Sequence, residues 1–111
     1  MPATFDKEGA LDRVDGDRKL LKELIQICMT QCRSKIPAME QMLRANQFAS
    51  IASNAHILRG SLGNVGGDAS SDVAAKLELA ATRHDEAQIS DLLASLTVEV
   101  DDFFEVAAEE L

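Results

Sequence analysis

The chain of 111 residues contains no tryptophan, no tyrosine and only four phenylalanines, so its core must be built mainly from aliphatic side chains. It has no apolar run long enough to cross a membrane, and its start, polar from Phe5-Asp6 onward, does not resemble a signal peptide. The two cysteines are therefore expected to be reduced thiols in a cytosol. These absences predict one cytoplasmic domain over residues 1–111, with no membrane contact of its own.

Basic residues are also scarce: the chain has 11 lysines and arginines and 19 acidic residues, which gives a net charge of −8. A protein that binds a phosphate backbone needs a basic stripe, so nucleic acid is not expected as a partner. The acidic residues avoid one window, because Gln41 to Gly67 carries only Arg44 and Arg59 as charged residues. A site in this window would suit a phosphoryl group or an acidic partner.

Apolar residues recur at steps of three and four along most of the chain, which is the spacing of amphipathic helices. The expected buried stripes begin with Leu21, Leu24 or Ile25, Cys28, Cys32, Ile36, Met39 and Leu43, continue with Phe48, Ile51, Ala55, Leu58, Leu62 and Val65, then Val73, Leu77 and Ala80, and end with Ile89, Leu92, Leu93, Leu96, Val100, Phe103 and Ala107. No alternating strand pattern is present. The sequence predicts an all-α fold, an antiparallel up-and-down four-helix bundle with a short extra N-terminal helix across one end.

Turn and cap residues divide these helices. Asp6 is expected to cap the short first helix, which ends at Gly16, and Asp17 to cap the next. The segment Ala45-Asn46-Gln47, the pair Gly66-Gly67 and the segment His84-Asp85-Glu86 mark the later breaks, and Asp68, Ser70 or Ser71 can cap the fourth segment. Pro37 fits either a long helix with a kink or tight break, or a new helix starting near Ser34; the unbroken stripe favours the first.

His56 lies in a helical segment with Arg59, Gly60 and Gly63 near it on the same face. Two glycines inside a helix cost about 1 kcal/mol each relative to alanine, which suggests that something approaches the backbone here. On the helical wheel His56 points away from the buried stripe, so it should be exposed. Its neighbours there are mostly small: Ala49, Ala52, Gly60 and Gly63. Close packing of a neighbouring helix is the other explanation for the two glycines.

An exposed imidazole is a competent nucleophile near neutral pH, and Arg59 can hydrogen-bond phosphoryl oxygens on it. Ile57 offers an exposed apolar contact for a partner. No GxxxxGK nucleotide loop is present. No carboxylate lies within one helical turn of His56 on its face to orient it. The residues therefore predict a site that holds a phosphoryl group but does not start a reaction alone.

Metal binding is a weaker interpretation of other residues. Cys28 and Cys32 are four apart on one helix face, but no second ligand pair lies near them in sequence, so they are expected to be small core residues and no metal site is predicted. Asp15-Gly16-Asp17 lacks the remaining spacing of a calcium loop. His84 is interpreted as a turn residue.

The segment around His56 resembles the signature of histidine phosphotransfer (HPt) domains, the phosphocarriers of multistep two-component relays. The matching residues are Ala55-His56-Ile57-Leu58-Arg59-Gly60-Ser61-Leu62-Gly63-Asn64-Val65-Gly66. Phe5-Asp6, Gly16-Asp17, Pro37 and Leu77-Glu78 extend the resemblance over nearly the whole chain. Arg59 stands where the family more often has lysine, Leu62 where many members carry a small residue, and Gly67 replaces a common alanine.

The resemblance implies that His56 accepts a phosphoryl group from an aspartate of one receiver domain and passes it to an aspartate of another, with Arg59 stabilising the phosphoryl group. Response-regulator receiver domains would then be the partners, contacting Ala49, Ala52, Ile57, Gly60, Gly63 and Asn64. The receiver would supply Mg²⁺, so the chain is expected to need no cofactor and to have no autonomous kinase activity.

Two further questions stay open at this stage. The chain is either a free-standing cytoplasmic carrier or the C-terminal module of a hybrid sensor histidine kinase, in which case it belongs to the cytoplasmic portion of a membrane-bound protein. It is expected to be a monomer. A non-catalytic four-helix adaptor that binds a receiver or kinase domain is the alternative function.

Overall fold

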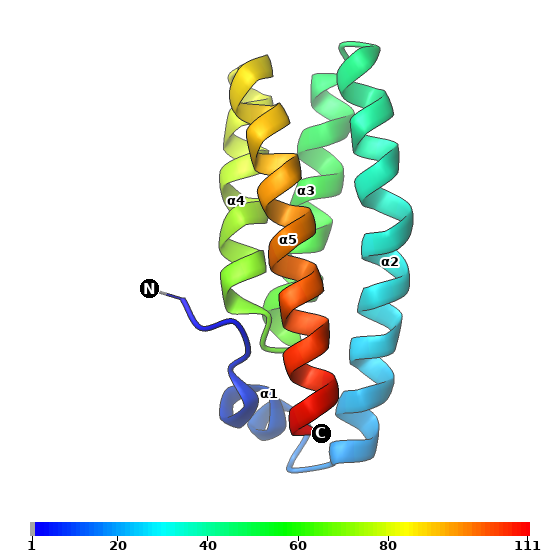
Figure 1. Cartoon of the computed structure of the whole chain (residues 1–111), viewed down its shortest axis with the longest axis vertical. Helices are drawn as coiled ribbons and strands as arrows, with labels where there is room; N and C mark the ends of the chain where they lie inside the picture. The colour runs from blue at the N-terminus through cyan, green and yellow to red at the C-terminus, as the bar shows by residue number, and fades with distance from the viewer. Residues whose placement is uncertain (1) are drawn as a thin grey trace.

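A computed structural model describes residues 2–111 and consists of five helices: α1 (Lys7–Arg13), α2 (Arg18–Arg44), α3 (Phe48–Asn64), α4 (Asp68–Thr82) and α5 (Glu86–Glu110). The described residues contain no strand. Figure 1 shows the four long helices side by side, running up and down in turn. Helix α3 packs between α2 and α4, and α5 closes the ring between α4 and α2. The predicted all-α bundle with a short first helix is confirmed.

The predicted caps are confirmed for the first two helices and wrong for the fourth. Asp6 and Asp17 accept hydrogen bonds from the backbone N–H groups of Gly9 and Leu20. Helix α4 instead begins after Gly67, with no side-chain cap. The reason is tertiary, because the backbone carbonyl of Ala3 accepts the N–H of Ala69 and satisfies one of the free donors at this end.

Helix α2 is continuous from Arg18 to Arg44 and passes through Pro37. The long helix is confirmed over a new helix near Ser34, but it has no break at Pro37. Proline cannot donate to the carbonyl of the residue four positions earlier, here Arg33. Pro37 lies on the exposed side of the helix, where solvent reaches that part of the backbone. The packing of the stripe on both sides of Pro37 therefore outweighs one lost hydrogen bond.

The core is aliphatic, as the composition predicted, with Phe103 as its largest fully buried side chain. The expected stripes are buried apart from four half-buried residues, Leu43, Phe48, Val73 and Leu92, and of the two alternatives Ile25 points inward while Leu24 is exposed. Cys28 and Cys32 are buried free thiols, which confirms them as core residues. A hydrogen bond with the neighbouring thiol of Cys28, together with burial, raises the pKa of Cys32.

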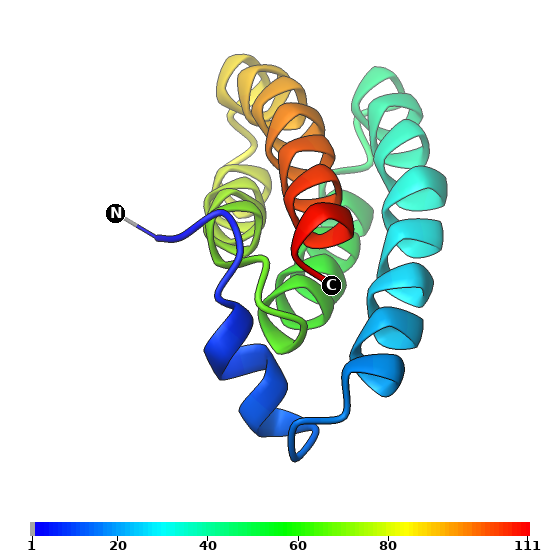
Figure 2. The same cartoon turned by 60° about the horizontal axis from the view of Figure 1, so that its bottom comes forward.

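The N-terminal segment and α1 cover one end of the bundle, as the view in Figure 2 shows. The backbone N–H of Asp6 donates to the carbonyl of Gly66 at 2.8 Å, and Phe5 packs on Phe103 with ring centroids 5.6 Å apart. Gly66 has φ of +86°, and a Cβ there would lie 2.7 Å from the carbonyl oxygen of Asp6. Only glycine fits this position, which joins the end of α3 to the N-terminal segment.

None of the helices in residues 2–111 combines the length and the apolar character that crossing a membrane requires.

Candidate functional site

His56 projects from the middle of α3 on the side next to α4. Its side chain is 58% exposed, whereas Ala55, Leu58 and Leu62 on the opposite side of the helix are completely buried. The predicted exposure of His56 is therefore confirmed. The buried stripe fixes the rotation of α3 in the bundle, and this rotation holds the imidazole at the surface.

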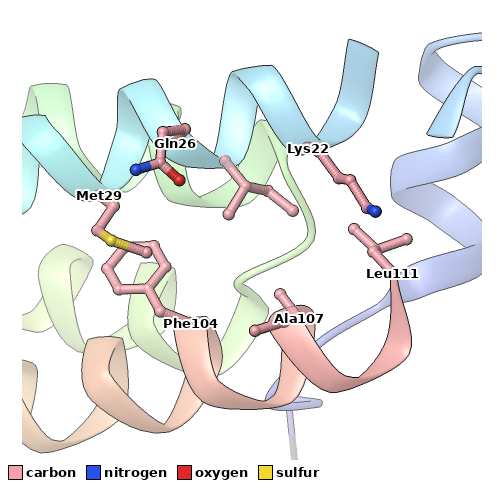
Figure 3. Close-up of a pocket in the computed structure, with 8 residues that line it drawn as sticks. Lys22, Gln26, Met29, Phe104, Ala107 and Leu111 are labelled. Atoms are coloured by element: carbon pink, nitrogen blue, oxygen red, sulfur yellow. The ribbon is translucent and has the colours of Figure 1, made fainter. Parts of the chain in front are cut away.

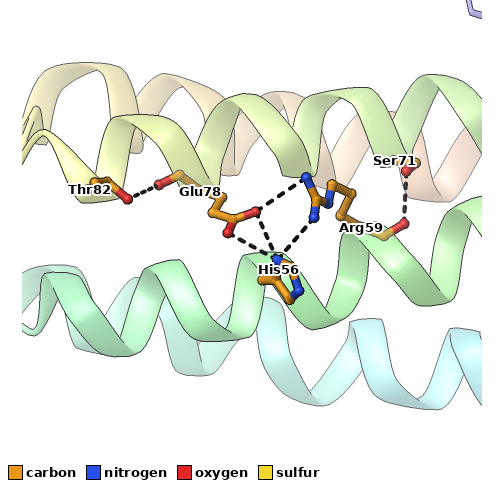
Figure 4. Close-up of polar contacts among 5 residues, drawn as sticks. All are labelled: His56, Arg59, Ser71, Glu78 and Thr82. Carbon is orange, nitrogen blue, oxygen red and sulfur yellow. Dashed lines mark hydrogen bonds and ion pairs between the residues drawn. The ribbon is translucent and has the colours of Figure 1, made fainter.

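Glu78 of α4 reaches across to the imidazole, as Figure 4 shows. Its carboxylate oxygens lie 3.0 and 3.3 Å from Nδ1 of His56, and the Glu78 side chain is 28% exposed. No carboxylate lies within a helical turn of His56 on α3 itself, as the sequence indicated, and the one beside it comes from the next helix. The sequence offered one signal, the pair Leu77-Glu78 in the helix that follows the histidine.

The guanidinium of Arg59 lies on the same side of the ring. One of its nitrogens is 3.1 Å from Nδ1 of His56, and the other is 3.7 Å from a carboxylate oxygen of Glu78. Arginine can only donate hydrogen bonds and a carboxylate can only accept them, so Nδ1 cannot satisfy both neighbours at once. With a proton on Nδ1 the ring donates to the Glu78 carboxylate and Arg59 still pairs with that carboxylate, whereas a bare Nδ1 would turn its lone pair toward the carboxylate oxygens, so the protonated Nδ1 is preferred.

This preference determines the tautomer of the ring. With the proton on Nδ1, the other ring nitrogen, Nε2, carries the free lone pair. Arg59 then interacts with the carboxylate of Glu78 rather than with the ring. The arrangement is a half-exposed imidazole whose Nδ1 is held by a carboxylate and whose Nε2 is available as a nucleophile.

One hydroxyl group joins α3 to α4 beside these residues, and a second acts within α4. Ser71 of α4 donates to the backbone carbonyl of Arg59 at 2.8 Å, and Thr82 donates to the backbone carbonyl of Glu78 at 3.0 Å within α4 (Figure 4). The hydrogen bond from Ser71 fixes the position of α4 along the axis of α3. Its acceptor lies only three residues from His56. The position of Glu78 relative to the imidazole therefore depends on the packing of the two helices.

The small residues around His56 divide into two groups. Ala49 and Gly60 are exposed, and a Cβ on Gly60 would meet nothing within 4 Å. Ala52 is half-buried and packs against the core, and a Cβ on Gly63 would lie 3.3 Å from the hydroxyl of Ser71. Gly60 therefore leaves open space beside the histidine, whereas Gly63 allows the close approach of α4.

The side of α3 that faces α2 is more apolar. Ile57 is 45% exposed, and Asn64 is exposed further along the same face. Between the two helices lies a cavity of about 250 Å³, lined by Leu24, Ile27, Cys28 and Gln31 of α2 and by Ser61, Asn64 and Val65 at the end of α3. Ile27 is 58% exposed and Leu24 is 37% exposed. His56 thus stands between a charged seam with α4 and a seam with α2 that is largely apolar near the end of α3 but carries a hydrogen bond from Lys35 to Asn54 close to His56.

A family model described as the Hpt domain matches residues 23–109. Searches of curated proteins and of solved structures gave no match. Because the match covers most of the chain, including all of α3, α4 and the site between them, the chain belongs to the Hpt domain family.

Membership of this family defines the general activity. Hpt domains take part in phosphotransfer in two-component signalling, where they work with the receiver domains of response regulators. They are phosphocarriers and do not act as autonomous kinases. The resemblance noted in the sequence is confirmed at this level.

Proposed function

We propose that His56 is the phosphoacceptor of this domain, and that it takes a phosphoryl group from the aspartate of one receiver domain and passes it to the aspartate of another. The observation that carries the proposal is the contact between Nδ1 of His56 and the carboxylate of Glu78, because it leaves Nε2 free in an exposed position. The other histidine, His84, stacks on Phe48 at the far turn and has no carboxylate among its hydrogen-bond partners in residues 2–111.

The transfer step follows from this tautomer. The lone pair of Nε2 attacks the phosphorus of the receiver's aspartyl phosphate, and the bond between phosphorus and the aspartate oxygen breaks, so its electron pair leaves on the carboxylate. The ring keeps its proton on Nδ1 and becomes a phosphorylated imidazolium, whose positive charge is stabilised by Glu78. No proton has to leave the site. The same steps in reverse return the phosphoryl group to a second receiver.

Arg59 is proposed to bind the transferred phosphoryl oxygens. Its guanidinium is 45% exposed and contacts both His56 and Glu78, so a rotation of the side chain brings it to a group on Nε2. The charge of Arg59 offsets part of the repulsion between Glu78 and the phosphoryl group. The domain needs no cofactor of its own in this mechanism, and the receiver supplies the Mg²⁺.

The receiver is proposed to contact the exposed small residues Ala49 and Gly60 and the apolar side of α3. Ala52 and Gly63 lie at the edge of this surface, toward α4. Ile57 adds an exposed apolar side chain next to the nucleophile, and Asn64 lines a cavity with Leu24 and Ile27 of α2 further along α3. Apolar area around a polar centre is typical of protein interfaces of this kind.

The family typically works in the cytoplasm, and we propose the same location here, either as a free-standing carrier or as a module of a hybrid sensor histidine kinase.

Incubation of the domain with a phosphorylated receiver domain and Mg²⁺ tests this function. We expect phosphate to appear on this chain, with the acid lability and alkali stability of a phosphohistidine, and ³¹P–¹⁵N coupling in NMR spectra should place it on Nε2. Absence of label with a panel of receivers would favour the alternative, a non-catalytic adaptor. Label on Nδ1 would contradict the tautomer assigned above while leaving the carrier function intact.

Substitution of Glu78 should slow phosphoryl acceptance. In Glu78→Ala the guanidinium of Arg59 can donate to Nδ1, which moves the ring proton to Nε2 and blocks the nucleophile. We expect transfer to be about tenfold slower, or more. The measurement is the single-turnover rate of transfer from a phosphorylated receiver.

Glu78→Gln is the matched control, because its amide oxygen still accepts a hydrogen bond from Nδ1–H. It should lie between the wild type and Glu78→Ala. Equal rates for all three proteins, at unchanged helical content, would show that Glu78 does not orient the histidine.

A further inference from the structure

Helix α2 carries two thiols, Cys28 and Cys32, on its buried stripe. They are four residues apart, so their side chains lie one above the other on the same face of the helix. Both are free, and only 2% and 1% of their surfaces are exposed. They are the only cysteines of the chain, and the phosphotransfer proposed for His56 uses neither of them.

The two thiols contact each other. A hydrogen bond from the Cys32 thiol to the sulfur of Cys28 lowers the pKa of Cys28 in spite of its burial, and the same contact raises the pKa of Cys32. Cys28 is therefore the thiol that ionises first, and the thiolate is the form that binds soft ions and electrophiles. The pair consists of one reactive sulfur with a second sulfur held beside it.

A disulfide does not fit this pair while α2 is helical. Residues four apart on a helix have Cβ atoms about 5 to 6 Å apart, whereas the Cβ atoms of a disulfide are about 3.5 to 4.5 Å apart. A single atom bonded to both sulfurs spans the longer distance. The spacing therefore favours a bridging thiophilic atom over oxidation of the pair.

Each thiol lies at the wall of a cavity. Cys28 lines a cavity of about 250 Å³ between α2 and α3, together with Ile27. Cys32 lines another of about 240 Å³ between α2 and α5, together with Phe104. Figure 3 shows the adjoining part of this second seam, where Met29 of α2 lies across from Phe104. Both cavities are open to solvent and largely apolar, so an apolar reagent has a path to the sulfurs in the folded protein.

We propose that Cys28 and Cys32 form a binding site for trivalent arsenic that carries one apolar group, such as an aryl- or alkylarsonous acid. The arsenic atom bridges the two sulfurs, and its apolar group lies in one of the two cavities. Each thiol replaces one hydroxyl group on arsenic: an As–O bond breaks, an As–S bond forms, and the thiol proton leaves with the hydroxide as water. Arsenic and sulfur keep their oxidation states, so no oxidant or reductant is needed.

The number of ligands makes this site selective. Soft thiolate ligands suit soft ions, but zinc takes four ligands, and residues 2–111 contain no group of three or more metal-ligating side chains. An arsenical with one apolar group needs only two sulfurs. Once Cys28 has bound, Cys32 adds its bond within the same molecule, which strengthens binding by about a hundredfold or more over a single thiol.

Titration of the purified domain with phenylarsine oxide tests the site. We expect native mass spectrometry to show one arsenic per chain, and both free thiols to be lost together, at a helical content that circular dichroism shows to be unchanged. A 1,2-dithiol should remove the arsenic, whereas the same concentration of a monothiol should not. This reversal is measured on the wild-type protein, so it does not depend on how any variant folds.

Serine substitutions separate the pair from a single reactive thiol. Cys28→Ser and Cys32→Ser should each weaken binding by about a hundredfold or more, because each removes one of the two bonds to arsenic. Thr30→Ser, on the exposed side of the same helical turn, is the matched control and should bind as the wild type does. Binding that occurs only after unfolding in urea overturns the proposal. So does a folded single-serine variant that binds as tightly as the wild type, or a wild-type complex that a monothiol dissociates as readily as a dithiol.

Discussion

Replacement of His56 by glutamine will abolish phosphoryl acceptance. Glutamine is similar in length and polar, and His56 is 58% exposed, so the bundle should fold as before. The variant has no ring nitrogen with a free lone pair next to Glu78 and Arg59, and an amide nitrogen is not a nucleophile at neutral pH. Transfer of ³²P from a charged receiver should therefore fall to background. This loss is the largest effect that we expect from any single substitution.

The chain provides its own control, because it contains only two histidines. His84 is exposed at the turn between α4 and α5 and stacks on Phe48, with ring centroids 4.5 Å apart. His84→Gln should retain full acceptance. If label persisted in His56→Gln and disappeared in His84→Gln, the site would have to be moved to the far end of the bundle.

Replacement of Gly60 by phenylalanine should slow transfer by roughly a hundredfold, since small errors in the alignment of reacting groups have effects of this size. Gly60 is one helical turn from His56, and a side chain there enters open space rather than the core. The phenyl ring would therefore occupy the volume through which a receiver approaches Nε2. The rate of transfer between receiver and domain, measured by rapid quenching, gives the effect.

Gly60→Ala separates the steric effect from a change in the helix. The added methyl group has space, and alanine favours helix by up to about 1 kcal/mol over glycine, so this variant should be more stable to urea and nearly as fast in transfer. If Gly60→Phe transferred phosphate at the wild-type rate, the open space beside the histidine would have no role in partner approach.

Most of the fold could be predicted from local information in the sequence. The apolar stripes of α2 and α5 repeat over many turns, and the caps Asp6 and Asp17 are satisfied by backbone groups three residues away. The start of α4 could not be predicted in the same way. Its backbone donor at Ala69 is satisfied by the carbonyl of Ala3, which is distant in sequence.

The same distinction applies to the candidate site. The exposure of His56 and its proximity to Arg59 follow from helical geometry alone, because the two residues are three apart on one helix. The carboxylate of Glu78 is 22 residues away and belongs to another helix. Its position depends on the level at which α4 packs along α3, and periodicity carries no information about that level. The sequence could not separate the roles of Gly60 and Gly63 either, because which of the two glycines faces α4 also depends on how α4 packs against α3.

The hydrogen bond between His56 and Glu78 joins two helices, so the reactivity of His56 depends on how α3 and α4 pack together. A slip of α4 by one turn would move the carboxylate by about 5.4 Å and leave the imidazole free to exchange its proton between both nitrogens. A chain with intact helices but loose packing would then carry the complete motif and still be a poor acceptor. Only correctly packed molecules would then accept and pass on the phosphoryl group, so misfolded copies would not contribute to signalling.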